Sequence, residues 1–144
     1  MAESPDSHLV EFVPVTVEVA EADVIAMMDV MGDINPVHSD HDLVAELGLR
    51  GLVNQGPANL AYALNMIVAW AGDPASIRRV DVRFDAITCP GDRLVATGGV
   101  TSTTRTGNET IATCAFRLDR DLGNGTTEQI LSGTADVLAP QETK

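Results

Sequence analysis

The stretch GPANLAYALNMIVAWA, residues Gly56–Ala71, is apolar on nearly every side. A helix with such a pattern is buried along its length, so we expect this segment to lie at the centre of the fold. Its main apolar stripe is predicted to consist of Leu60, Leu64, Ile67 and Val68. Pro57 suits the first helical position, and Gly72-Asp73-Pro74 ends the helix.

After this helix the sequence predicts only strands. They are expected at Ile77–Ile87, Leu94–Thr103, Thr110–Arg120 and Gln129–Leu138, following one another as a meander. The third alternates cleanly and is expected to turn four residues inward: Ala112, Cys114, Phe116 and Leu118. Gly123-Asn124-Gly125 predicts a hairpin turn between the last two strands.

Before the helix, Phe12–Val19 alternates as a half-buried strand, with Pro14 near its start or on an edge. Glu21–Met31 has helical spacing, and Gly32 is expected to end that helix. Its predicted core stripe is Val24, Met27, Met28 and Met31. A short helix is predicted over Asp40–Leu47, with Asp40 as its cap and Gly48 as its stop.

An antiparallel sheet with one apolar face and one very apolar helix would bury each against the other. The sequence therefore predicts an α+β fold, in which an antiparallel sheet wraps around a long central helix. At 144 residues we expect a single domain spanning 1–144, with short flexible tails at 1–8 and 140–144.

The composition excludes several classes of function. A formal net charge of −12 argues against nucleic acid or an anionic membrane as the main partner. No apolar run reaches membrane-spanning length, and Met1–Ser7 lacks the apolar core of an export signal. Cys89 and Cys114 show no metal-ligand spacing. Cys114 is expected to face inward and to be inert, and Cys89 lies near a strand end with no visible activating partner. We expect a reduced, cytoplasmic protein.

The densest chemistry lies in Met31–His38, which reads MGDINPVH. Pro36 restrains its own backbone and that of Asn35, so Asp33 and His38 are carried on a stiff turn. Gly56 lies where a helix begins, and free backbone N–H groups at such a position favour an anion. Pro57 has no N–H, which leaves Gly56 as the expected donor.

Gly32-Asp33-Ile34-Asn35-Pro36-Val37-His38 resembles the hydratase-2 motif of the MaoC-like dehydratases, which have the hot-dog fold. The resemblance extends from about Val19 to Val137. It includes Gly56 with its apolar helix and, on the following strands, Arg83-Phe84 and Pro90-Gly91-Asp92. The chain looks most like the short, single-hot-dog dehydratase subunits of lipid metabolism, some of which pair with a related subunit that lacks the motif.

The resemblance implies reversible addition of water to a trans-2-enoyl thioester, which gives the (R)-3-hydroxyacyl product. Asp33 and His38 would hold the attacking water and share the proton transfers, and Gly56 would donate to the thioester oxygen. Asn35 and Gln55 would support the site, although the family usually has His where this chain has Gln55. No metal or redox cofactor is implied, because the substrate is carried as a thioester of coenzyme A or an acyl carrier protein.

Three other interpretations stay open. In the first, Asp33 and His38 serve only as a helix cap and a satisfied turn residue. In the second, the chain is a non-catalytic or partner-dependent subunit of a heteromeric hydratase. An acyl-thioester hydrolase is also possible in this fold, but those enzymes commonly place a carboxylate on or beside the central helix, and Gly56–Ala71 contains no Asp or Glu.

Substrate and partner are less constrained. Arg78, Arg79 and Arg83 form the basic cluster of an acidic chain and are either a solvated strand face or a site for coenzyme A phosphates. Exposed sheet edges favour a homodimer or a heterodimer with a related subunit. The sequence leaves open the identity of the acyl chain, which could include a steroid side chain, and the identity of the carrier. It also leaves open the direction of the reaction and whether Asp33 or His38 begins protonated. His41 is interpreted as a solvated helix residue rather than a metal ligand.

Overall fold

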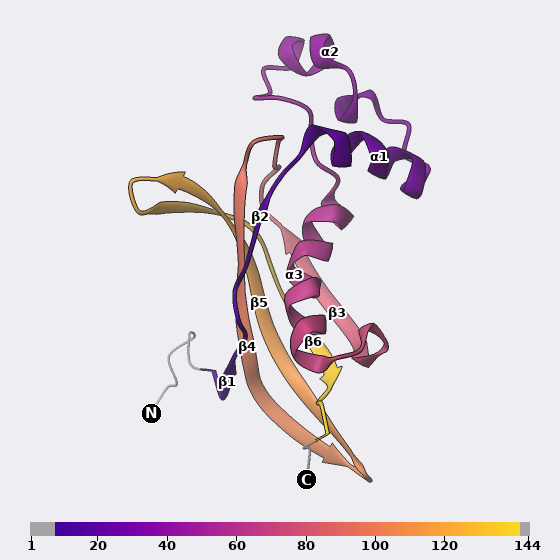
Figure 1. The fold of residues 1–144 in the computed structure, drawn as a ribbon, viewed down its shortest axis with the longest axis vertical. Helices are drawn as coiled ribbons and strands as arrows, with labels where there is room; N and C mark the ends of the chain where they lie inside the picture. Colours follow the sequence, from indigo (N-terminus) through magenta and orange to yellow (C-terminus); the bar gives the residue numbers. More distant parts are fainter. Residues whose placement is uncertain (1–7, 142–144) are drawn as a thin grey trace.

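One antiparallel sheet curves around helix α3 (Gly56–Ala71), while α1 (Glu21–Met31) and α2 (His41–Glu46) gather beyond one end of that helix (Figure 1). The computed structural model describes residues 8–141, so most of the tails predicted at 1–8 and 140–144 lies outside the described residues. Two short 3-10 turns, η1 (Pro36–His38) and η2 (Pro74–Ser76), join the elements. The predicted α+β class is confirmed.

The sheet has six strands in the order β1-β4-β5-β6-β3, with β2 also paired to β4. They are β1 (Val10–Glu11), β2 (Val15–Glu18), β3 (Ile77–Phe84), β4 (Arg93–Thr106), β5 (Glu109–Gly123) and β6 (Thr126–Leu138). The predicted meander is therefore right for β4, β5 and β6 but wrong for β3, which pairs with β6. The first two strands occupy the outer edge of β4, so β3 joins the opposite side of the sheet.

The core lies between α3 and the inner face of the sheet. The inward alternation predicted for β5 is confirmed, since its four apolar residues Ala112, Cys114, Phe116 and Leu118 are buried. On α3 the predicted stripe is wrong in part. Ile67 is buried together with Ala63 and Met66, whereas Leu60, Leu64 and Val68 are only half-buried. The sheet covers one side of α3, so the other side lacks a covering layer within the described chain.

The buried face of helix α1 differs more from its prediction than that of α3 does. Its bounds and its left-handed stop at Gly32 are as predicted, but of its apolar residues only Val24 is buried, and Met31 is 39% exposed. The reason is position: α1 lies beyond the end of the sheet, so it has no broad apolar surface to pack on (Figure 1). Helix α2 begins as predicted, with the Asp40 carboxylate accepting from the backbone N–H groups of Asp42 and Leu43.

Close backbone approaches allow the sheet to bend around α3. Gly98 and Gly133 flank Phe116 in neighbouring strands. A Cβ at Gly98 would meet the backbone oxygen of Ala115, and one at Gly133 would meet that of Asp81. The Phe116 ring also lies 2.6 Å from the position of a Cβ at Gly133. Only glycine fits such approaches. No helix in the described residues is long and apolar enough to cross a membrane.

Candidate active site

The turn that follows α1 is fixed by its own hydrogen bonds. The backbone N–H of Asp33 donates to Met28 O at 2.9 Å, which holds the acid against the end of α1. The Asn35 N–H donates to Asp33 Oδ1 at 3.0 Å, and the Asn35 side chain accepts from the Val37 N–H at 3.2 Å. Asn35 thus caps η1, and it orients Asp33 through its backbone.

This turn brings Asp33 and His38 together. Asp33 Oδ2 lies 3.0 Å from His38 Nε2, and the other ring nitrogen, Nδ1, lies 2.6 Å from the carbonyl oxygen of Val53. His38 is buried, whereas about a third of the Asp33 side chain remains exposed. The imidazole is therefore held at both nitrogens, while the carboxylate keeps access to solvent or substrate.

The contacts of His38 constrain where its protons lie. A carbonyl oxygen can only accept, so Nδ1 carries hydrogen and donates to Val53. The short contact between Nε2 and Asp33 Oδ2 then requires one further proton, because two bare lone pairs would repel each other. The pair shares that proton, either as imidazolium and carboxylate or as imidazole and carboxylic acid. It thus contains one acidic and one basic position.

The beginning of α3 lies three residues beyond Val53 and offers unpaired donors. Within the described residues, no side chain caps this helix, and neither the Gly56 nor the Ala58 N–H has a hydrogen-bond partner. The first N–H of the helix that is bonded to the chain is that of Asn59, which donates to Gln55 O. Gly56 is half-buried and Ala58 is buried. An uncapped helix start of this kind is suited to bind a negatively charged oxygen.

The Gln55 side chain turns toward α1. It is 2% exposed, its Nε2 donates to Val24 O at 2.9 Å, and its Oε1 is buried without a partner. Its hydrogen bond ties the buried residue of α1 to the start of α3 and does not involve Asp33 or His38. A supporting role for Gln55 therefore stays a prediction, directed at the placement of Gly56.

The family model described as MaoC like domain matches residues 3–115, which is most of the chain. The chain belongs to the MaoC-like domain family. The recognition based on Asp33, His38 and Gly56 is thereby confirmed at the level of the family. A search of curated proteins found no significant match.

Solved structures share the fold of this MaoC-like chain. R-hydratase PhaJ1 from Pseudomonas aeruginosa superposes with a TM-score of 0.80 at 23% identity, over 94% of this chain and 84% of that one. The (R)-hydratase from A. caviae gives 0.78 at 18% identity, over 95% and 100%. A chain of the ChsH1-ChsH2 complex from Mycobacterium tuberculosis gives 0.74 at 17%, over 92% and 98%. These matches show that the predicted hot-dog fold is correct.

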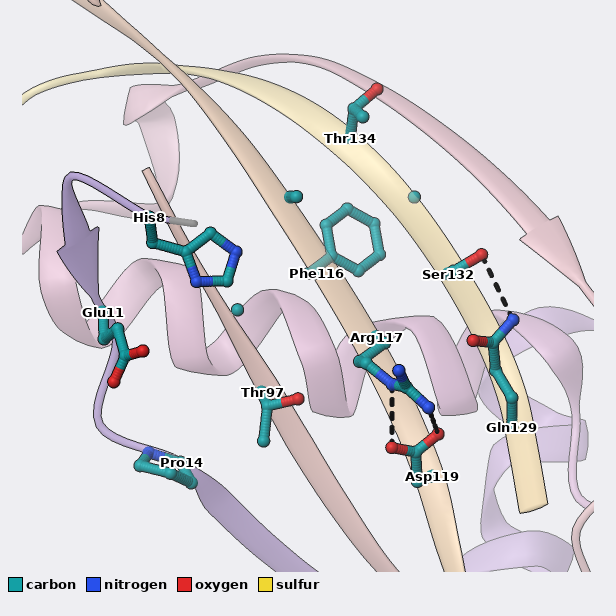
Figure 2. Close-up of a pocket in the computed structure, with 13 residues that line it drawn as sticks. His8, Glu11, Pro14, Thr97, Phe116, Arg117, Asp119, Gln129, Ser132 and Thr134 are labelled. Carbon is teal, nitrogen blue, oxygen red and sulfur yellow. Dashed lines mark hydrogen bonds and ion pairs between the residues drawn. The ribbon is translucent and has the colours of Figure 1, made fainter. Parts of the chain in front are cut away.

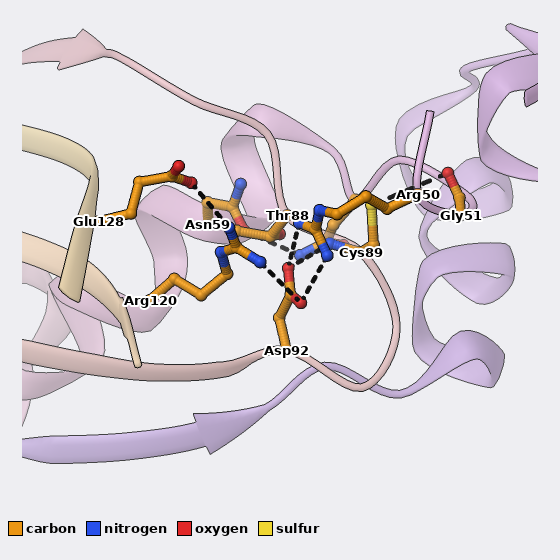
Figure 3. A network of polar contacts seen from close by, with 9 residues as sticks. Arg50, Gly51, Asn59, Thr88, Cys89, Asp92, Arg120 and Glu128 are labelled. Atoms are coloured by element: carbon orange, nitrogen blue, oxygen red, sulfur yellow. Dashed lines mark hydrogen bonds and ion pairs between the residues drawn. The ribbon is translucent and has the colours of Figure 1, made fainter. Parts of the chain in front are cut away.

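Two polar clusters beside the candidate site were not predicted, and Figure 3 shows them. In the first, Asn59 Oδ1 accepts from Asn54 Nδ2 at 2.9 Å and from Thr88 Oγ1 at 2.8 Å, and the Asn54 N–H donates to Thr88 O. Asn54 and Asn59 flank the first turn of α3 at the two positions where an apolar pair often fixes the entry of the chain. The sequence feature that points to this cluster is Asn59, a polar residue inside an otherwise apolar helix.

In the second cluster, Asp92 receives both Nη groups of Arg50 at 2.9 Å and the backbone N–H of Cys89 at 2.9 Å (Figure 3). Burial raises the pKa of Asp92, but the hydrogen bonds from Arg50 and Cys89 outweigh it and leave that pKa below its ordinary value. The hydrogen bond to Asp92 likewise raises the pKa of Arg50. The ion pair fastens the loop that carries Val53 to the turn at Pro90-Gly91-Asp92.

The predicted basic cluster is paired with acids. Arg78 lies 3.6 Å from Glu109, Arg79 lies 2.9 Å from Asp81, and Arg83 lies 2.9 Å from Asp85. Each arginine remains largely exposed, but its charge is balanced by a neighbour. Binding of coenzyme A phosphates at this strand stays a prediction.

Other titratable groups lie outside the site. Burial raises the pKa of Cys114 to about 11, which agrees with the expectation that this thiol is inert, and burial also raises the pKa of Cys89. His41 lies 2.6 Å from Glu21 on the surface, in agreement with its interpretation as an exposed helix residue.

An open cavity of about 860 Å³ lies over the outer face of the sheet and contains none of the predicted site residues (Figure 2). Polar side chains such as Thr97, Arg117, Gln129 and Ser132 line it. Arg117 and Asp119 form an ion pair along β5 at 2.8 Å, as Figure 2 shows. Arg117 and Asp119, which line the cavity, alternate along β5 with the buried residues Phe116 and Leu118. The cavity and α3 therefore lie on opposite faces of the sheet.

Proposed function

We propose that the chain catalyses the reversible hydration of trans-2-enoyl thioesters to (R)-3-hydroxyacyl thioesters, as a hydro-lyase of the hydratase-2 type. The observation that carries this proposal is the contact of 3.0 Å between Asp33 and His38, with the second ring nitrogen of His38 fixed by Val53. Membership of the MaoC-like family supports it.

The shared proton suits this chemistry. Water adds through its oxygen to C3 of the conjugated acyl group while the basic member of the dyad accepts a proton from that water. The acidic member delivers its proton to C2, so that the C3–O and C2–H bonds form and the double bond is lost. The dyad ends with one proton, as it began.

Negative charge collects on the thioester oxygen as water adds. The unpaired N–H of Gly56 at the start of α3 is the donor that we assign to this oxygen, and the adjacent N–H of Ala58 is also free within the described residues. A single donor of this kind contributes roughly two to three powers of ten in rate. The proposed reaction needs no metal and no redox cofactor.

The test is the loss of conjugated-enoyl absorbance when the purified chain meets trans-2-enoyl thioesters of coenzyme A and of an acyl carrier protein. Straight, branched and ring-bearing acyl groups would identify the substrate class. We expect turnover, and a product that is oxidised by an (R)-specific but not by an (S)-specific 3-hydroxyacyl dehydrogenase. Absence of turnover across the panel, or an (S) product, would contradict the proposal.

A second candidate is a subunit that becomes active only with a related hot-dog chain. The likeness to a chain of the ChsH1-ChsH2 complex favours it, because that neighbour is a complex of two different proteins. Turnover that appears only after a related hot-dog subunit is added would support this candidate. The carboxylate-free α3 argues against an acyl-thioester hydrolase.

A further inference from the structure

The backbone between Val53 and Gly56 joins the two halves of the proposed site. The Val53 carbonyl oxygen holds His38 Nδ1 at 2.6 Å, and Gly56, at the start of α3, carries the N–H that we assign to the thioester oxygen. Such groups act together only while they stay within roughly 0.5 Å of the productive geometry. Whatever fixes Asn54 and Gln55 therefore fixes the distance between the dyad and the donor.

The peptide unit between Val53 and Asn54 is held at both of its polar ends. Its carbonyl oxygen accepts from His38, and its N–H, which belongs to Asn54, donates to the backbone oxygen of Thr88 at 2.9 Å. Rotation of this peptide would break both hydrogen bonds together. The orientation of His38 therefore depends on where Thr88 lies.

Thr88 is linked to the same segment a second time, through its side chain (Figure 3). Its Oγ1 donates to Asn59 Oδ1 at 2.8 Å, and Asn54 Nδ2 donates to the same oxygen at 2.9 Å. The Asn59 N–H in turn donates to the Gln55 carbonyl oxygen at 3.1 Å. A single buried amide oxygen therefore joins the loop before α3, the first turn of α3 and the segment between β3 and β4.

The three side chains of this network are closed off from solvent. Asn54 is 4% exposed, Asn59 is 2% exposed and Thr88 is fully buried. The residue after Thr88 is fixed as well, because the Cys89 N–H donates to Asp92 at 2.9 Å. In a buried place hydrogen bonds are stronger than in water, so the network can hold the Asn54 peptide against a firm support.

An apolar pair would hold the start of α3 more simply. Asn54 and Asn59 occupy the two positions at which such a pair commonly packs, and burying two amides and a hydroxyl costs free energy that an apolar pair would not cost. Apolar contacts are non-directional, whereas a hydrogen bond weakens steeply as its angle changes. The polar network therefore adds a fixed orientation of the Asn54 peptide.

We propose that Asn54, Asn59 and Thr88 are positioning residues for the hydration reaction. They orient the Val53 carbonyl, and through it His38, relative to the Gly56 N–H, while none of them transfers a proton. The effect on rate rests on the proposed function, but the effect on His38 can be measured without any substrate.

Thr88→Val and Thr88→Ser separate orientation from packing. Valine keeps the shape of threonine and removes the hydroxyl, whereas serine keeps the hydroxyl and leaves a small cavity. Thr88→Val should lower kcat for enoyl-thioester hydration by about ten- to a hundredfold, with KM within about twofold of wild type, because the reacting groups are misplaced. Thr88→Ser should keep kcat within about threefold of wild type, because the hydroxyl still holds Asn59.

The second readout is the Nδ1–H proton resonance of His38, assigned by its absence from His38→Gln. The hydrogen bond of 2.6 Å to Val53 should place this resonance far downfield in wild type. Thr88→Val should shift or broaden it, and Thr88→Ser should leave it in place. Thr113→Val removes a hydroxyl that bonds Asp136 at 3.4 Å between β5 and β6, and as the control it should change neither kcat nor the resonance.

The outcomes distinguish this inference from the proposed function. Wild-type kcat and an unchanged His38 resonance in Thr88→Val, or an equal loss of kcat in Thr88→Ser and Thr88→Val, would overturn the positioning role and leave the hydration itself intact. A wild type without turnover would contradict the proposed function. The His38 resonance of Thr88→Val would then support the orienting network if it shifts and overturn it if it does not.

A second variant keeps the test decisive if Thr88→Val does not fold. Asn54→Ala removes the other donor to Asn59 Oδ1 and leaves Thr88 in place. It carries the same prediction for kcat and for the His38 resonance, and wild-type values of both would overturn the proposal.

Discussion

The position of the proton on His38 depends on Val53, which contacts the imidazole only through its backbone oxygen. The carbonyl of Val53 determines that Nδ1 carries hydrogen, and this in turn makes the Nε2 contact with Asp33 a shared-proton contact. The motif identified the two members of the dyad. Every residue has a backbone carbonyl group, so the sequence does not show which carbonyl contacts His38. The proton arrangement therefore required the structure.

The loop that carries Val53 is held by Asp92. Asp92→Asn should lower the free energy of unfolding at neutral pH by about 2 kcal/mol, because a buried charged acceptor of three hydrogen bonds is lost while Arg50 remains. Thermal unfolding followed by circular dichroism measures this change. Asp29→Asn, on the exposed face of α1, is the control and should change stability little.

The pH dependence has a definite sign. The folded-state pKa of Asp92 is lower than its unfolded value, so its contribution is fully present above the unfolded pKa and is lost as pH falls through the folded one. The difference between wild type and Asp92→Asn should therefore shrink below about pH 4. A difference that stays constant down to pH 2 would contradict the assigned ion pair.

At the scale of elements, the sequence predicted most boundaries well. Gly32, Asp40 and the Gly123-Asn124-Gly125 turn carry local signals that do not depend on distant contacts, and each acts as expected. The buried stripes of α1 and α3 were less predictable, since both helices are apolar on more than one side. Which side is buried depends on where the sheet lies, and this is not a local property.

The bend in the sheet depends on glycine in β6. Gly133→Ala should lower the free energy of unfolding by about 1–3 kcal/mol, because the new methyl group would meet the Asp81 carbonyl and the Phe116 ring. Denaturant unfolding measures the loss. Gly51→Ala, where the nearest atom lies 3.7 Å away, is the matched control. Equal stability of the two variants would show that β3 can move aside at no cost.

In the molecule as a whole, the placement of β3 differs most from the arrangement that the sequence predicts. Adjacent strands usually pair, but the outer edge of β4 is taken by β1 and β2, which precede α3 in the chain. As a result β3 becomes an edge strand that carries Phe84 next to Gly56. The end of this edge strand therefore lies beside the donor that we assign to the thioester oxygen.

The central claim is that Asp33 and His38 carry out the hydration, and Asp33→Asn tests it most directly. Asparagine keeps the size of the side chain but can neither accept nor release the shared proton, so kcat for enoyl-thioester hydration should fall by about two to four powers of ten. Asp29→Asn should retain the wild-type rate. Comparable rates for Asp33→Asn and wild type, with both proteins folded, would contradict the account.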